Sequence, residues 1–149
     1  NISKASTCRK SLGCVLVKDN YLIGIGYVGS VHGDYHCTVD NHEVENCLLV
    51  ENKGLFGSGD NTSCIRTIHA EMNAILNIQT IIRGQKDNWI ICYSTYQPCL
   101  NCFKSLLQIG VRKFVYNLPY IDINRDTYID SLNLNIMEDF SMYKISIFK

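Results

Sequence analysis

The apolar positions of the first quarter of the chain fall into two short blocks that predict a β-hairpin. Cys14-Val15-Leu16-Val17 and Tyr21-Leu22-Ile23-Gly24-Ile25 flank the polar triplet Lys18-Asp19-Asn20. Short apolar runs bounded by Asp and Asn are typical of two strands joined by a tight turn. We therefore expect strands over 14–17 and 21–25.

The pattern is lost between Gly29 and Ser63, where Gly, Asn, Asp, His and Cys dominate. Such a stretch is expected to be a long loop region that needs a cross-link to stay ordered. Its own composition indicates a metal ion for that purpose.

Helices and strands are predicted to alternate after this region. Thr67 or Thr62 can cap a helix over about 67–80, in which apolar residues recur at helical spacing. The elements expected beyond it are a strand over 89–93, a turn at 97–98, a helix over 100–108, a strand over 113–116, a helix over 126–132 and an edge strand over 143–148. This order predicts an α/β fold, a central sheet with crossover helices.

Length and charge bound the class of protein. The chain has 149 residues, enough for one domain, and its 14 basic and 14 acidic residues cancel. This balance does not favour a nucleic-acid groove or an anionic membrane surface, and a small ligand fits better. Without a secretory segment or an 18-residue apolar run, we expect a cytoplasmic protein. The chain begins at Asn1 without an initiator Met, and we expect that a preceding segment is missing.

Eight cysteines in 149 residues are fewer than a disulfide scaffold carries. In a reducing compartment they favour metal binding or catalysis, although an even count also permits disulfides.

The sharpest motif pairs His69-Ala70-Glu71 with Pro98-Cys99-Leu100-Asn101-Cys102, each at the start of a predicted helix. One imidazole and two thiolates make three protein ligands of a catalytic zinc and leave a fourth position for water. Zinc lowers the pKa of this water, and Glu71 is placed to move its protons. The spacing is the signature of zinc nucleobase deaminases. The alternatives are a redox Cys-x-x-Cys pair or a structural zinc, but a redox pair would not need His69 and Glu71.

The other six cysteines divide into two groups. Cys14 and Cys92 lie in apolar strands and are expected to be buried thiols. The second group shares the predicted loops with three histidines, and four ligands would close a structural zinc site. Spacing alone does not select four ligands from these seven residues: Cys8, Cys37, Cys47, Cys64, His32, His36 and His42.

The chain resembles deoxycytidylate (dCMP) deaminases of the cytidine/deoxycytidylate deaminase superfamily, in particular the type found with bacterial late-competence operons. The resemblance covers roughly residues 6–120. Its most specific segments are Cys64-Ile65-Arg66-Thr67-Ile68-His69-Ala70-Glu71-Met72-Asn73-Ala74-Ile75-Leu76 and Gln97-Pro98-Cys99-Leu100-Asn101-Cys102. It implies a three-layer α/β/α sandwich with a mixed five-stranded sheet, a single deaminase domain over 1–149, and a homo-oligomer.

The resemblance also implies a second, structural zinc on Cys8, Cys37, His42 and Cys64. His36 and Cys47 are the first substitutes if one ligand is misplaced.

Substrate contacts are implied at four positions. Asn73 is expected to contact the sugar, Tyr96 to wall the base, Arg9 to meet the 5′-phosphate and Tyr116 to lie near that phosphate. For each, an ordinary structural role is the alternative: a surface amide, packing, or a solvated cation.

The implied reaction converts dCMP to dUMP with release of ammonia and feeds dTMP synthesis, with dCTP and dTTP as possible effectors. Two departures from the family pattern stand out: Val28, where the motif reads Gly-Tyr-Asn-Gly, and an insertion over 48–63 that could gate the pocket or contact a neighbouring subunit. The alternatives are a cytidine, cytosine or tRNA adenosine deaminase, or a catalytically silent zinc-binding module. Zero net charge argues against a tRNA editor.

Overall fold

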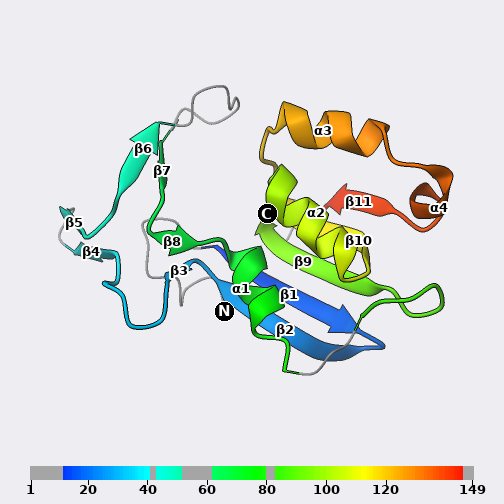
Figure 1. Cartoon of the computed structure of the whole chain (residues 1–149), viewed down its shortest axis with the longest axis horizontal. Helices are drawn as coiled ribbons and strands as arrows, with labels where there is room; N and C mark the ends of the chain where they lie inside the picture. The colour runs from blue at the N-terminus through cyan, green and yellow to red at the C-terminus, as the bar shows by residue number, and fades with distance from the viewer. Residues whose placement is uncertain (1–11, 41–42, 52–61, 80–82, 146–149) are drawn as a thin grey trace.

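A mixed five-stranded sheet forms the body of the protein (Figure 1). The computed structural model describes residues 12–40, 43–51, 62–79 and 83–145. The strands lie in the order β11-β10-β9-β1-β2, and β9, β10 and β11 are mutually parallel, whereas β1 is antiparallel to β9 and β2. Their bounds are β1 Gly13–Lys18, β2 Tyr21–Tyr27, β9 Ile90–Tyr96, β10 Val111–Leu118 and β11 Ser141–Lys144. The predicted α/β fold with a mixed sheet is confirmed.

The β1–β2 hairpin forms as predicted, with Lys18 paired to Tyr21. The two residues between them, Asp19 and Asn20, have φ values of 52° and 66°. Two consecutive residues with positive φ make the turn whose twist matches that of the flanking strands, and Asp and Asn tolerate this conformation.

Helix α1 (Ala70–Leu76) packs directly on β1 and β2. Its sheet-facing residues are small, because Ala70 and Ala74 are buried while Leu76 is exposed. The close approach depends on β2: a Cβ at Gly26 would meet the Ala70 carbonyl oxygen and the Ala74 nitrogen, each at 2.2 Å. The helix that carries the His-Ala-Glu motif is therefore held against the sheet by backbone contact.

The predicted bounds of this helix, 67–80, were wrong at both ends. Thr67–Ile68 forms strand β8, which pairs with β3 (Gly29–Ser30), and the Thr67 hydroxyl donates to the Cys64 carbonyl. Thr67 is thus not an N-cap, and the helix begins three residues later. It ends at Leu76 with Asn77 as its C-cap.

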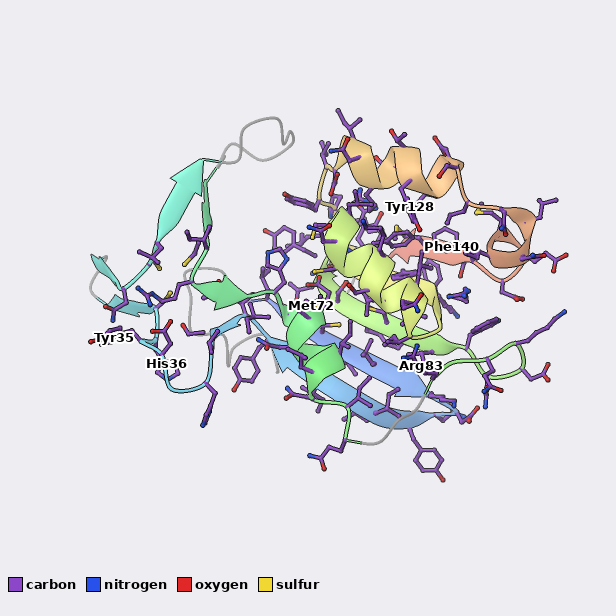
Figure 2. The ribbon with its side chains drawn as sticks, in the orientation of Figure 1. Tyr35, His36, Met72, Arg83, Tyr128 and Phe140 are labelled. Atoms are coloured by element: carbon purple, nitrogen blue, oxygen red, sulfur yellow. The ribbon has the colours of Figure 1, made fainter. Side chains whose placement is uncertain are left out.

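Helices α2 (Leu100–Gln108) and α3 (Ile123–Asp130) pack side by side. The ring of Phe103 in α2 lies 4.8 Å from that of Phe114, 6.2 Å from Tyr128 and 5.8 Å from Phe140, measured between ring centroids. Figure 2 shows Tyr128 and Phe140 in the space between α2, α3 and β11. This aromatic cluster ties the last quarter of the chain to the sheet.

Helix α2 has the predicted bounds, whereas α3 begins at Ile123 and not at 126. Its N-cap is Asp122, whose side chain accepts from the main-chain nitrogen of Arg125. The short helix α4 (Leu134–Met137) follows, and β11 begins two residues before the predicted edge strand. The predicted end of that strand, 146–148, lies outside the described residues.

The segment from Gly29 to Ser63 is not a loop throughout. Besides β3 it contributes β4 (Thr38–Asp40), β5 (Glu43–Glu45), β6 (Leu49–Glu51) and the start of β7 (Thr62–Cys64). β4 pairs with β5 and β6 with β7, and these two ribbons project away from the main sheet (Figure 1). The ends of the predicted 48–63 insertion are thereby joined in an antiparallel ladder, while 52–61 lies outside the described residues.

Among the residues that the structure describes, no helix combines the length and the apolar character needed to cross a membrane.

Candidate metal and catalytic site

The starts of α1 and α2 bring together the three predicted zinc ligands. His69 is the N-cap of α1, and Cys99 is the N-cap of α2, with Cys102 one turn further into that helix. Neither N-cap side chain makes a capping hydrogen bond. Both are therefore left to face the space where the two helix starts meet.

The donor atoms have the separation that a tetrahedral zinc ion requires. His69 Nδ1 lies 3.6 Å from Cys99 Sγ and 3.4 Å from Cys102 Sγ. All three donor atoms lie within 4.8 Å of one another. Typical zinc–nitrogen and zinc–sulfur bonds at a tetrahedral angle would separate N and S by about 3.6 Å. The three side chains thus fit a single zinc ion without rearrangement.

The hydrogen bond between the two thiols shifts their pKa values in opposite directions. A hydrogen bond from Cys102, opposed by burial and reinforced by His69, lowers the pKa of Cys99 to about 4. The same bond to Cys99, together with burial, raises the pKa of Cys102. The hydrogen bond with Cys99 also raises the pKa of His69. Negative charge is thus favoured at Cys99, as is typical of a thiol at a helix start beside a histidine.

Glu71 lies in the first turn of α1 and is buried, with 8% of its side chain exposed. Burial raises the pKa of its carboxyl group, and its own main-chain N–H, the charge of His69 and a hydrogen bond from Cys102 partly offset this. A carboxyl group with a raised pKa beside a metal site is suited to accept and return protons.

Asn73 does not stand free on the helix surface. Its Nδ2 donates to the Tyr27 carbonyl at 2.8 Å and ties α1 to the end of β2. One turn further on, Asn77 Nδ2 donates to the Ile25 carbonyl, also at 2.8 Å. The amide oxygen and the second Nδ2 hydrogen of Asn73 remain for the predicted sugar contact.

Tyr96 and Tyr116 are half-buried residues of β9 and β10. Because side chains alternate along a strand, they share the helix-facing side of the sheet with Cys92 and Phe114. Tyr96 lies two residues before Pro98, at the end of β9 that leads into the metal site. Arg9, the predicted phosphate contact, lies outside the described residues.

The structure adds Asp122 and Arg125, which no sequence motif identified, and it places Tyr120, which the family resemblance sets near the phosphate, close to the metal ligands. Burial, and next the negative charge of Cys99, raises the pKa of Tyr120, which places this phenol within electrostatic reach of the metal ligands. Asp122 and Arg125 bind the main chain around Cys99. A helix-start signal was present in the sequence, because Asp122 precedes a segment with Asp126 in the first turn of α3.

A second group of donors lies at the base of the projecting ribbons. Cys37, Cys47 and Cys64 have their sulfur atoms within 4.8 Å of one another, and those of Cys37 and Cys64 are 3.6 Å apart. Two thiolates on a tetrahedral zinc ion would be separated by about 3.8 Å. Cys47, which the resemblance left among the loop residues, therefore belongs to this cluster. Cys8 and His42, the other two predicted ligands, lie outside the described residues.

Main-chain and side-chain groups of the ribbons surround this cluster. Burial alone would raise the pKa of Cys64, but the main-chain N–H groups of Arg66 and Leu48 lower it to about 7. The Arg66 guanidinium binds both carboxylate oxygens of Asp34, at 3.0 and 2.9 Å, and donates to the Asn46 carbonyl at 2.7 Å. The Arg66 guanidinium also lies 5.8 Å from the centroid of the Tyr35 ring. Figure 2 shows Tyr35 and His36 near each other in this part of the molecule.

Comparison with known proteins agrees with this geometry. The family model described as "Cytidine and deoxycytidylate deaminase zinc-binding region" matches residues 2–118, and the chain belongs to this family. ComE operon protein 2 of Bacillus subtilis (strain 168) is 37% identical over 116 residues, which cover 77% of this chain and 52% of that protein. Deoxycytidylate deaminase of Schizosaccharomyces pombe is 34% identical over 131 residues, which cover 87% of this chain and 37% of that protein. The chain thus spans about half of the length of the first relative and 37% of the second.

The solved structures support the fold. The dCMP deaminase from the cyanophage S-TIM5, in complex with dCMP and dUMP, superimposes with a TM-score of 0.63 over 96% of this chain and 88% of that chain. Its sequence identity is 23%. At this identity the likeness shows a shared deaminase fold.

Proposed function

We propose that this chain deaminates dCMP to dUMP with release of ammonia, using a zinc ion held by His69, Cys99 and Cys102. One observation carries the proposal: three donors at tetrahedral spacing lie beside the buried Glu71, at the meeting point of two helix starts. Three protein ligands are typical of catalytic zinc sites, whereas structural zinc sites use four.

Each residue of the site has a defined part in this reaction. When bound, the zinc ion supplies an activated water molecule at neutral pH. Glu71 carries two protons in turn: its carboxylate accepts one from the water and passes it to the ring nitrogen of cytosine, then accepts one from the new hydroxyl on the ring carbon and passes it to the departing amine. The thiols at the start of α2 lie where the helix dipole favours negative charge.

The choice of dCMP rests on relatives that carry the name deoxycytidylate deaminase, including the one from Enterobacteria phage T2, 28% identical over 87% of that protein. We assign the sugar contact to the amide oxygen of Asn73, the wall of the base pocket to Tyr96, and the phosphate contacts to Arg9 and Tyr116. The proposal includes assembly as a homo-oligomer and regulation by dCTP and dTTP.

We further propose that Cys37, Cys47 and Cys64 hold a second, structural zinc ion, with Cys8 or His42 as the fourth ligand. The support is the mutual spacing of the three sulfur atoms and the N–H groups that lower the pKa of Cys64. Four ligands leave no position for water, so this ion would stabilise the ribbons and take no part in the reaction.

Ammonia release tests the function directly. The purified protein is supplied side by side with dCMP, CMP, deoxycytidine, cytidine and cytosine, and kcat/KM is measured for each. We expect the highest value for dCMP. A higher value for a nucleoside or for the free base would overturn the dCMP assignment, and no release from any of them would overturn the deaminase assignment.

A further inference from the structure

Two buried side chains of opposite charge lie on either side of Cys99. Asp122 is 4% exposed and Arg125 is 2% exposed. An oxygen of Asp122 accepts from the main-chain nitrogen of Leu100 at 2.9 Å, and Arg125 Nη1 donates to the Pro98 carbonyl at 2.9 Å. Both peptide groups that flank Cys99 are therefore held by residues that follow it by more than 20 positions. We call this pair the Cys99 clamp.

The clamp lies where the buried charged side chains of the described residues are found. Within the described ranges, the buried charged side chains are Glu71, Asp122 and Arg125, and all three lie at the proposed metal site or around its ligands. Burying a charge is costly unless it is paired by hydrogen bonds. The clamp meets this condition, because Asp122 also accepts from the Arg125 main chain at 3.0 Å, and Arg125 also donates to Asp126 at 3.2 and 3.1 Å.

The clamp binds the start of α2, where Cys99 itself makes no capping bond. An N-cap side chain ordinarily accepts a hydrogen bond from one of the first N–H groups of its helix. Cys99 makes no such bond, and its sulfur lies with His69 and Cys102. The carboxylate of Asp122 accepts from the N–H of Leu100, the first residue of the helix. The backbone of Cys99 is thus held at φ −70° and ψ 167°, which sets the direction of its Cα–Cβ bond and so the position from which Sγ reaches the other donors.

We propose that Asp122 and Arg125 are positioning residues that hold Cys99 in its metal-binding geometry and thereby set the affinity of the catalytic metal site. This inference rests on the proposed metal site at His69, Cys99 and Cys102. Residues that orient metal ligands from outside the coordination sphere typically change metal affinity or activity 10–100-fold when they are replaced.

Cobalt binding provides a test that does not depend on turnover. The metal-free protein is titrated with Co²⁺ against a chelator, and the absorption bands that the Cys99→Ser variant lacks are assigned to this site. Asp122→Asn keeps the size of the side chain. It replaces one of the two carboxylate oxygens that accept from the N–H groups of Leu100 and Arg125 by an NH2 group, which cannot accept. Arg125→Met removes the donors, whereas Arg125→Lys keeps one charged donor. The thermal unfolding of every metal-free variant is measured in parallel.

Arg112 provides a matched control. This half-buried arginine donates to the Leu107 carbonyl at 2.8 Å, near the opposite end of α2, and its guanidinium lies 4.4 Å from the Trp89 ring centroid. Arg112→Met should lower the thermal stability of the metal-free protein and leave cobalt affinity at the parent value.

We expect Asp122→Asn and Arg125→Met to weaken cobalt binding at this site by about 10–100-fold, and Arg125→Lys to retain most of the affinity. If Asp122→Asn does not fold, the comparison of Arg125→Met with Arg125→Lys decides. Parent-like affinity in Arg125→Met, or an equal loss in Arg112→Met, would overturn the clamp while leaving the metal site intact. A parent protein without the Cys99-dependent bands would overturn the proposed site itself, and the clamp with it.

Discussion

The side-chain amide of Asn73 donates a 2.8 Å hydrogen bond to the main-chain carbonyl of Tyr27, at the end of the strand that forms the edge of the sheet. Asn77 repeats the contact at Ile25, one turn along α1 and two residues along β2. One helical turn of α1 thus matches two residues of β2, so that the amides of Asn73 and Asn77 lie opposite the carbonyls of Tyr27 and Ile25. Asn73 therefore has a structural role besides the sugar contact proposed for it, and Asn77 provides a measure of that structural role alone.

We predict that Asn73→Ala and Asn77→Ala lower the free energy of unfolding by similar amounts, about 1 kcal/mol each, because each removes one hydrogen bond to an edge carbonyl. Only Asn73→Ala should also raise the KM for dCMP. Chemical denaturation and steady-state kinetics measure the two effects. Equal KM values in the two variants would show that Asn73 has no substrate contact.

Glu71→Gln should retain the fold and the bound zinc but lose turnover by at least about a hundredfold, since the amide cannot carry the proton. Zinc content, thermal unfolding and ammonia release are measured on the same preparation. Glu138→Gln, a change at the exposed C-cap of α4, is the control and should keep full activity. Activity of the Glu71 variant within tenfold of the parent would contradict the assigned role.

Gly26→Ala should displace α1 and lower both stability and activity, because the new Cβ would meet main-chain atoms of Ala70 and Ala74 that cannot move independently of the helix. Gly33→Ala is a suitable comparison. Gly33 has φ 88° and nothing within 4 Å of an added Cβ, so the change costs only about 1–2 kcal/mol of backbone strain. A Gly26 variant as stable and active as the Gly33 variant would show that α1 does not depend on this close approach.

Cys64→Ser should reduce the zinc content from two ions per chain to one and lower the melting temperature, because binding energy at a structural zinc site contributes to folding. A chelator should lower the melting temperature of the parent protein more than that of the variant, since the variant has already lost the stabilising ion. A single zinc ion per chain in freshly purified parent protein would refute the second site.

Val28→Asn should lower the KM for dCMP and leave kcat nearly unchanged, because the amide can bind polar atoms of the nucleotide away from the reacting carbon. Val28 is 6% exposed and belongs to the apolar core, so the same change should also destabilise the fold by about 1–3 kcal/mol. Val28→Thr buries a polar group in a side chain of nearly the same size as valine but without the amide, so it measures the loss of stability apart from the change in KM. Equal use of deoxycytidine and dCMP by the parent would indicate that Val28 marks a different specificity.

Local sequence was sufficient where the determining contacts are close together in the chain. The β1–β2 hairpin follows from two apolar blocks around Asp19-Asn20, and α2 follows from the residues between Pro98 and Gly110. The grouping of His69, Cys99 and Cys102 was predicted from two short motifs, although spacing along the chain sets only the separation of Cys99 from Cys102 and the fold brings His69 to them.

Tertiary structure decided what depends on segments far apart. Helix α1 begins at Ala70 because Thr67–Ile68 pairs with Gly29–Ser30, a partner that the helical spacing of apolar residues does not reveal. Cys47 joins Cys37 and Cys64 because the β4–β5 ladder brings Cys37 near it and the β6–β7 ladder brings Cys64 near it, and the spacing of the seven candidate ligands along the chain does not reveal these pairings.

The sequence by itself determined the class of chemistry, because the types of ligand and their spacing restrict the metal and the reaction. Only the tertiary structure placed Asp122 and Arg125 against the peptides of Cys99, since an N-cap carboxylate and an arginine are ordinary residues until the fold buries them beside a metal ligand.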